Sequence, residues 1–184
     1  STIPTRTGLG SSSAMCIGLI NCIKKFANLK ISSKEIVKSA FNIERKICKI
    51  YGGWQDQIIS QFGGIVDIKI KKKNKLIIKK LKITGNIEKT IKQNFLLVYT
   101  RIKRESSKII SSQYETIDAD KIYDEIKKLN NPIFNYINKR NIKKIGDNFN
   151  YHWQLKKKLS KKITDPKIDK LYDILTSKFN IFCG

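Results

Sequence analysis

Apolar residues recur with helical spacing in the first quarter of the chain. Residues 14–20 are apolar nearly all round, so we predict a buried helix that runs to about Ala27, with Ser11 or Ser12 as its N-cap. The run Ser-Ser-Lys-Glu at 32–35 is a capping box and predicts the start of a second helix. Its apolar positions keep a period of about 3.6 residues: Ile36, Val37, Ala40, Phe41, Ile47 and Cys48.

Strand patterns follow in the middle of the chain. Residues 65–70 alternate between apolar and polar, and residues 76–78 answer them across a Lys/Asn turn, which predicts a hairpin. The continuous apolar run 95–99 predicts a buried strand. From about residue 103 the pattern is mostly helical, and Asp165 followed by Pro166 predicts the start of a last helix. The lysine-rich stretch 82–94 is where we place a domain boundary.

The composition adds a large positive charge, with 38 Lys+Arg against 15 Asp+Glu and a formal net charge of +23. Only five of these bases are arginine, whereas nucleic-acid-binding surfaces use arginine for base contacts and aromatic residues for stacking. We interpret the lysines as solvated faces and keep a basic nucleic-acid-binding module as an alternative. The charge is also expected to attract anionic ligands such as nucleotides and sugar phosphates.

Cysteine and histidine chemistry has little support in this sequence. The single histidine, His152, excludes a histidine-based zinc site or catalytic triad, and we interpret it as a packing or surface residue. The cysteines form no C-x-x-C pair, so we expect reduced core residues of a cytoplasmic protein: Cys16, Cys22, Cys48 and Cys183. No apolar run reaches the length of about 20 residues that a membrane-spanning helix needs, so we expect no membrane span.

The strongest signal for chemistry is the loop that precedes the first helix. Gly8 and Gly10 allow the backbone to turn tightly and to approach a ligand closely. The helix start that follows offers unpaired N–H groups and about half a positive charge. Together they predict a phosphate cradle, to which serine hydroxyls can add donors or a ligand for Mg²⁺. The alternative is that glycine and serine only cap the helix.

Two acidic residues stand at positions that suggest a function. Glu44 lies on the apolar stripe of its helix, and a buried carboxylate needs a cation or strong donors. A Mg²⁺ ion at the phosphates would serve, as would a salt bridge to a nearby lysine. Asp56 follows the pair Gly52 and Gly53, where it can accept a proton from a hydroxyl or orient that hydroxyl. An aspartate that merely caps a helix is the alternative.

These three elements, in this order, resemble the motifs of the GHMP kinases (galacto-, homoserine, mevalonate and phosphomevalonate kinases). Residues 4–14 resemble the phosphate-binding motif of that superfamily. Residues 40–45, followed by 53–57 and 62–64, resemble its metal-ligand helix and its catalytic acid. The runs Ile-Glu-Arg at 43–45 and Gln-Asp-Gln at 55–57 most resemble the D-glycero-D-manno-heptose 7-phosphate kinase branch.

The resemblance implies a role for each matching residue. Asp56 would be the catalytic base or would orient the sugar hydroxyl, and Ser12 with Glu44 would bind Mg²⁺. Substrate contacts would come from Gln55, Asp56 and Arg104. The ATP phosphates would be held by Pro4, Gly8, Leu9, Gly10, Ser11, Ser12, Ser13 and Ala14.

The implied fold is α+β. It is the GHMP kinase fold, with an S5 domain 2-like N-terminal half and a ferredoxin-like, helix-rich C-terminal half, both incomplete. We expect residues 1–92 to be a partial N-terminal domain with the phosphate-binding and catalytic motifs, and residues 93–184 a partial C-terminal domain. The superfamily's N-terminal substrate strands and its third, glycine-rich motif are missing from the sequence, so we expect a piece of a longer protein.

The implied reaction is ATP- and Mg²⁺-dependent phosphorylation of the anomeric hydroxyl of D-glycero-D-manno-heptose 7-phosphate by direct in-line transfer. Alternatives are another sugar or alcohol kinase (galactokinase-, fucokinase- or mevalonate kinase-like) and a relative that binds nucleotide without turnover. The expected partners are ATP and a sugar or sugar phosphate, without membrane or nucleic acid, in the cytoplasm. Two residues depart from the pattern of the branch and can alter the sugar pocket. Arg101 stands where the branch usually has glycine, and Trp54 stands where a smaller or basic residue is common.

Overall fold

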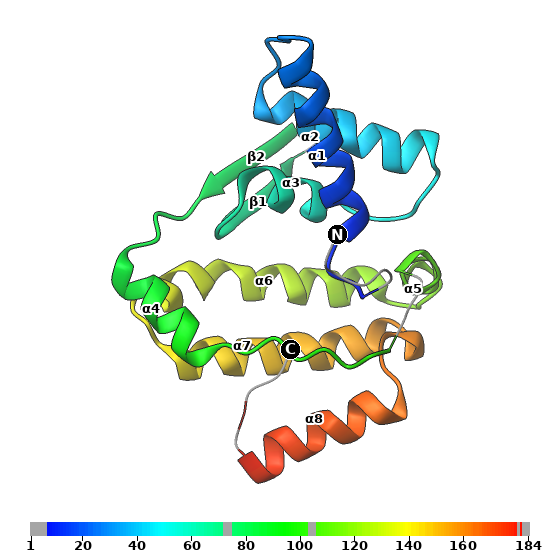
Figure 1. Ribbon diagram of the computed structural model, residues 1–184. Coiled ribbons are helices and arrows are strands. Elements are labelled where there is room, and N and C mark those ends of the chain that lie inside the picture. Colours follow the sequence, from blue (N-terminus) through cyan, green and yellow to red (C-terminus); the bar gives the residue numbers. More distant parts are fainter. Residues whose placement is uncertain (1–6, 72–74, 103–105, 180, 182–184) are drawn as a thin grey trace. The chain divides into compact units, whose positions relative to one another are not determined.

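The structure, a computed structural model, describes the chain except for residues 1–6, 72–74, 103–105, 180 and 182–184 (Figure 1). It divides into two compact units, Ser1–Ile83 with Arg101–Ser107 and Thr84–Thr100 with Lys108–Gly184. The described elements, in chain order, are α1 (Ser11–Phe26), α2 (Ser33–Asn42), η1 (Ile43–Ile47), α3 (Gln55–Phe62), β1 (Val66–Lys71), β2 (Lys75–Lys80), α4 (Gly85–Asn94), α5 (Ser106–Tyr114), α6 (Ala119–Asn138), α7 (Ile142–Leu159), η3 (Lys161–Ile163) and α8 (Pro166–Phe179). This is a helix-rich α+β structure. The domain limits 1–92 and 93–184 stay a prediction.

The described part of residues 1–83 in the first unit contains the helices α1, α2, η1 and α3 and the hairpin of β1 and β2 (Figure 1). Helices α1, α2 and α3 contact one another, and α3 also contacts β1. The buried apolar side chains between them are Ile17, Ile36, Val37, Ala40 and Ile58. The predicted capping box at the start of α2 is confirmed, because the Ser32 hydroxyl accepts from the Glu35 amide while the Glu35 carboxylate accepts from the Ser32 amide. The capping box fixes the start of α2, and the buried apolar side chains hold α2 against α1.

Helix α1 has the predicted length, but the prediction that it is buried is wrong. Only Ser13 and Ile17 of this helix are buried. Neighbouring elements cover one face of α1, so apolar side chains on its other faces stay exposed among the described residues, with Phe26 92% exposed. Exposed along with it are Met15, Leu19, Cys22 and Ile23.

The predicted hairpin is confirmed. Strands β1 and β2 pair antiparallel, with Ile68 opposite Ile78. The Lys80 ammonium donates to the carbonyl of Phe62 at 2.8 Å and so ties the hairpin to the end of α3.

A π-helical turn, η1, continues α2 and carries Glu44. Its wider turn is closed by a hydrogen bond from the Cys48 amide to the Ile43 carbonyl at 2.8 Å. Because each residue of a π-turn adds less rotation than in an α-helix, the apolar stripe of α2 does not continue past it. The prediction that Ile47 and Cys48 share that stripe is wrong, since both are exposed.

Helices dominate the second unit, in which α6 and α7 run side by side (Figure 1). Its buried apolar residues include Ile145, Leu155 and Leu159 of α7. The predicted start of α8 is confirmed, because the Asp165 carboxylate accepts from the amides of residues 167 and 168. The described residues from 84 onward form no strand, so they contribute none to the ferredoxin-like half that the resemblance implies.

The prediction of a buried strand at 95–99 is wrong. These residues follow α4 as an irregular segment, and all five are exposed, with Leu96 88% exposed. Apolar character favours a strand only where a partner strand is available, and the described sheet consists of β1 and β2 alone. Just beyond this segment Arg101 adopts a left-handed φ of +59°, a conformation that favours glycine.

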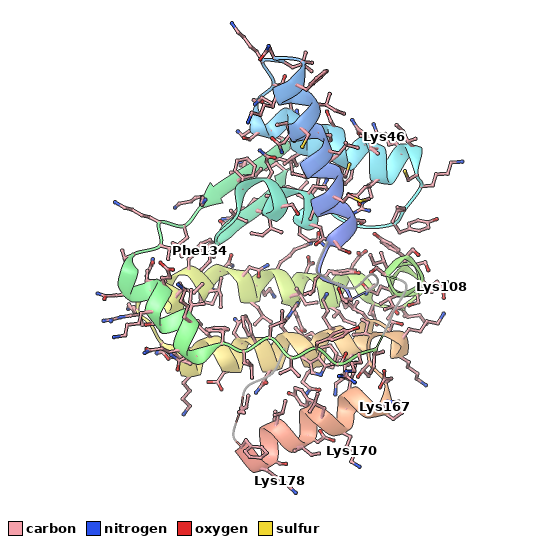
Figure 2. All side chains as sticks on the ribbon, viewed as in Figure 1. Lys46, Lys108, Phe134, Lys167, Lys170 and Lys178 are labelled. Carbon is pink, nitrogen blue, oxygen red and sulfur yellow. The ribbon has the colours of Figure 1, made fainter. Side chains whose placement is uncertain are left out.

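Lysines on α8 point away from the helix into solvent (Figure 2). Lys167, Lys170 and Lys178 are all exposed, as expected for solvated faces. Among the helices of the described part, none is both long and apolar enough to cross a membrane.

Candidate active site

The glycine–serine loop leads directly into α1. Gly10 is the N-cap, with a left-handed φ of +67°, and the Ala14 amide makes the first helical bond to the Gly10 carbonyl at 3.0 Å. The prediction of Ser11 or Ser12 as the cap is therefore wrong, since both serines lie inside the helix. The first turn has no acidic residue and no side-chain cap. Its N–H groups are thus left for an anion, as a phosphate cradle requires.

Glu44 is 4% exposed and lies at the centre of the candidate site. Its Oε1 accepts a hydrogen bond from the Ser12 hydroxyl at 2.9 Å, and its Oε2 accepts from the Ser13 hydroxyl at 2.7 Å. The amide nitrogen of Gln57, which is fully buried, donates to the same Oε2 at 2.5 Å. These donors come from α1 and α3, and all are neutral. They compensate in part for the burial of the charge without a counter-ion.

The oxygen atoms of Ser12 and Glu44 fit a Mg²⁺ ion that also binds oxygens of a bound ligand. Adjacent ligands of octahedral Mg²⁺ lie about 2.9 Å apart, because each is about 2.0–2.1 Å from the ion. The Ser12 Oγ and the Glu44 Oε1 are separated by this distance, 2.9 Å. The described residues hold no cluster of three His, Cys, Asp or Glu side chains for a metal. A cation here would need further oxygens, which Mg²⁺ ordinarily takes from water and substrate phosphates.

Asp56, in the first turn of α3, lies against the loop. A Cβ on Gly10 would be 3.2 Å from the Cγ of Asp56, so only glycine leaves the aspartate undisturbed. Burial raises the pKa of the Asp56 carboxyl above its ordinary value, the nearby Arg45 guanidinium lowers it, and the charge of Glu44 raises it again. A partly desolvated carboxylate next to a phosphate cradle can accept a proton from a substrate hydroxyl.

Arg45 holds the loop that precedes Asp56. Its guanidinium donates to the carbonyls of Ile50 at 3.3 Å and Gly53 at 3.2 Å. A side chain at Gly52 would collide with this guanidinium, since a Cβ there would lie 2.6 Å from the Arg45 Cζ. Beside it, the rings of Phe41 and Trp54 stack in parallel with centroids 3.5 Å apart. These contacts define the path of the loop, which places Asp56 next to Gly10.

The structure brings together most of the residues that the sequence singled out. Ser12, Ser13, Glu44 and Asp56 converge with Gly10, whereas Gly8, Leu9 and Ala14 are exposed around them. Gln55 is exposed, and its amide oxygen lies against Gly53. Pro4 and Arg104 lie outside the described residues.

Sequence reasoning missed two residues of this site, Gln57 and Arg45. The signal for Gln57 was present, because a glutamine next to Ile58 falls on the buried face of α3 and needs a polar partner. Arg45 could not be assigned, because its contacts depend on the path of a loop. The hydroxyl of Thr7 is buried without a hydrogen-bond partner among the described residues, which fits a loop that receives a polar ligand.

The sequence of this chain is similar to sequences of known proteins. Residues 1–64 match the family model described as "GHMP kinases N terminal domain". Residues 1–64 are thus similar to the N-terminal domain of the GHMP kinases. The D-glycero-alpha-D-manno-heptose 7-phosphate kinase of Campylobacter jejuni is 25% identical over 181 residues, which cover 95% of this chain and 52% of that protein. The mevalonate kinase of Methanocaldococcus jannaschii is 30% identical over 176 residues, with coverages of 95% and 52%.

A crystal structure is similar to this chain in fold. A Campylobacter jejuni protein proposed to be a sugar kinase superposes with a TM-score of 0.60 at 22% identity, over 94% of this chain and 49% of that protein. The chain thus spans about half the length of the relatives it matches. The residues that match the family model include the loop, Glu44 and Asp56.

Proposed function

We propose that this chain provides the nucleotide- and metal-binding site of an ATP-dependent sugar or alcohol kinase. The proposal rests on the groups that lie together at Gly10. The helix start behind it is free for an anion, the Ser12 and Glu44 oxygens have the spacing of magnesium ligands, and Asp56 lies against the glycine. All of these residues belong to the first unit.

The residues of the site would act mainly by position and charge. Backbone N–H groups at the start of α1 would hold the ATP phosphates, and Ser12 with Glu44 would hold Mg²⁺. The ion, when bound, would neutralise charge on the phosphate oxygens. Asp56 would accept the proton of the acceptor hydroxyl at a carboxylate oxygen. The hydroxyl oxygen would attack the γ-phosphorus in line, while the bond from the γ-phosphorus to the β,γ-bridging oxygen breaks and ADP leaves. Positioned base assistance of this kind is worth about 10²–10⁴-fold.

The acceptor that we propose is the anomeric hydroxyl of D-glycero-D-manno-heptose 7-phosphate, and a mevalonate-like alcohol is the second candidate. Both rest on the names of the relatives, at 25% and 30% identity over about half their length. The net charge of +23 favours an acceptor that already carries a phosphate or carboxylate. We further propose a cytoplasmic enzyme, since ATP and sugar phosphates are found there.

The proposal is tested by coupled ADP release from Mg-ATP with a panel of heptose 7-phosphate, galactose, fucose and mevalonate. We expect turnover with at least one acceptor. The variant Asp56→Asn should abolish phosphoryl transfer while ATP binding persists. Asp67→Asn is the matched control, because Asp67 lies on β1 and pairs with the exposed Lys69 at 3.6 Å. Near-wild-type turnover of Asp56→Asn would refute the catalytic role, and absence of Mg-ATP binding would refute the proposed function.

A further inference from the structure

The two oxygens of the Glu44 carboxylate have different environments. Oε2 accepts two hydrogen bonds, from the Ser13 hydroxyl at 2.7 Å and from the Gln57 amide at 2.5 Å. Oε1 accepts one, from the Ser12 hydroxyl at 2.9 Å. A carboxylate oxygen has about two lone-pair directions, so Oε2 is saturated and Oε1 keeps one free.

The side-chain amide of Gln57 donates to Glu44 through its nitrogen, but its oxygen is left without a partner in the described part of the chain. The residue is fully buried, and its Oε1 has no hydrogen-bond partner among the described residues. An unpaired buried acceptor is unfavourable, and the hydrogen bond to the Glu44 carboxylate has to offset this cost. This hydrogen bond also sets the rotation of the carboxylate around its last bond.

We infer that Gln57 is a positioning residue that occupies Glu44 Oε2 and thereby reserves Oε1 as a single-oxygen ligand for the metal ion. This inference rests on the proposed function, since it concerns the same Mg²⁺ site. Mg²⁺ requires an octahedral shell and binds such an oxygen well, whereas Ca²⁺ also accepts both oxygens of one carboxylate. Gln57 therefore favours Mg²⁺ over Ca²⁺.

The chain contains a matched control one turn further along α3. Gln61 accepts a hydrogen bond from the Asn21 side-chain amide at 2.8 Å and donates one to the Ser33 hydroxyl at 3.2 Å. It therefore also links α3 to α1 and α2. Gln57 and Gln61 thus have similar structural roles, but Gln57 alone of the two binds the Glu44 carboxylate. Comparing Gln57→Met with Gln61→Met separates positioning of the metal ligand from packing of the three helices.

The experiment measures the affinity of ATP for the protein by calorimetry in EDTA, in Mg²⁺ and in Ca²⁺. In Gln57→Met we expect an unchanged ATP affinity in EDTA. The gain in ATP affinity that Mg²⁺ gives should be smaller by about 10–100-fold, the usual effect of losing a residue that orients a metal ligand, and the preference for Mg²⁺ over Ca²⁺ should be weaker. Gln61→Met should keep the wild-type metal response even if it unfolds at a lower temperature. If Gln57→Met does not fold, Ser13→Ala removes the other donor to Oε2 and should lower the same preference.

The outcomes separate this inference from the proposed function. If neither metal strengthens ATP binding to the wild-type protein, the proposed function itself fails. If Mg²⁺ strengthens it and Gln57→Met responds like wild type, or like Gln61→Met, Gln57 does not position the ligand and the inference is wrong.

Discussion

Gly10 and Asp56 face each other so closely that a methyl group on the glycine would lie 3.2 Å from the carboxylate carbon. The glycine also has a left-handed φ of +67°, and the aspartate lies in the first turn of α3. The proposed phosphate-binding loop and the proposed catalytic acid are therefore in direct contact, without an intervening side chain.

This contact makes Gly10→Ala informative. The left-handed conformation disfavours alanine by about 1–2 kcal/mol, and the new methyl group must push Asp56 aside. We expect lower stability by that amount and a fall in turnover of about 10²-fold, since small displacements of reacting groups have effects of that size. Chemical denaturation and initial rates measure the two effects.

Two other glycines separate backbone strain from contact with Asp56. Gly8 has a φ of +78° but no neighbour within 4 Å of an added Cβ, so Gly8→Ala should lower stability with a smaller effect on turnover. Gly18 lies within α1 with open space around it, and Gly18→Ala should stabilise by about 0.5–1 kcal/mol. If Gly8→Ala and Gly10→Ala reduce turnover equally, the contact with Asp56 has no special importance.

Asp56 is expected to weaken the fold at neutral pH. Its pKa is raised, chiefly by burial, so the folded state binds more protons than the unfolded state between the ordinary pKa of 3.8 and the raised value. Stability therefore falls as the pH rises through that window and stays lower above it. Asp56→Asn should raise the melting temperature at pH 7 in EDTA and flatten this pH dependence. A lower melting temperature at pH 7 would show that the carboxylate is instead well compensated.

His152 provides a pH test of the second unit. It lies on α7, and its pKa is lowered below 6.5 by burial first and by the charge of Lys156 second. The unfolded state then binds more protons just below pH 6.5, so stability falls as the pH drops through 6.5 toward the lowered value. Because the sequence contains one histidine, an NMR titration of its ring protons reports this pKa directly. His152→Gln should remove the matching loss of stability, and a midpoint above 6.5 would contradict the expectation.

Local sequence signals predicted the elements whose stability is local. The capping box of Ser32 and Glu35, the hairpin that pairs Ile68 with Ile78, and the Asp165 cap of α8 all depend on residues a few positions apart, or on a short turn. Each is confirmed. Glu44 was also recognised as a buried acid, because it follows Ala40 by four residues, which is a local property of the sequence.

What sequence reasoning missed depends on partners distant in the chain. The run 95–99 is apolar enough for a strand but is not part of the described sheet, which consists of β1 and β2, and α1 has apolar side chains that stay exposed among the described residues. The π-turn at 43–47 breaks a period that pattern analysis assumes to be constant. The pairing of Gln57 with Glu44 required the packing of α3 against η1, which no spacing along the chain encodes.

The π-turn has a consequence for detecting ligands. Within it the Glu44 side chain faces α1 and α3, while its backbone carbonyl accepts from the Ile50 amide at 2.9 Å. One residue thus joins the carboxylate to the peptide backbone of the loop that leads to Asp56. A ligand that reduces the motion of Glu44 should slow deuterium exchange at the Ile50 amide. The exchange rate of this one proton can therefore report whether the site is occupied, even when no turnover is measured.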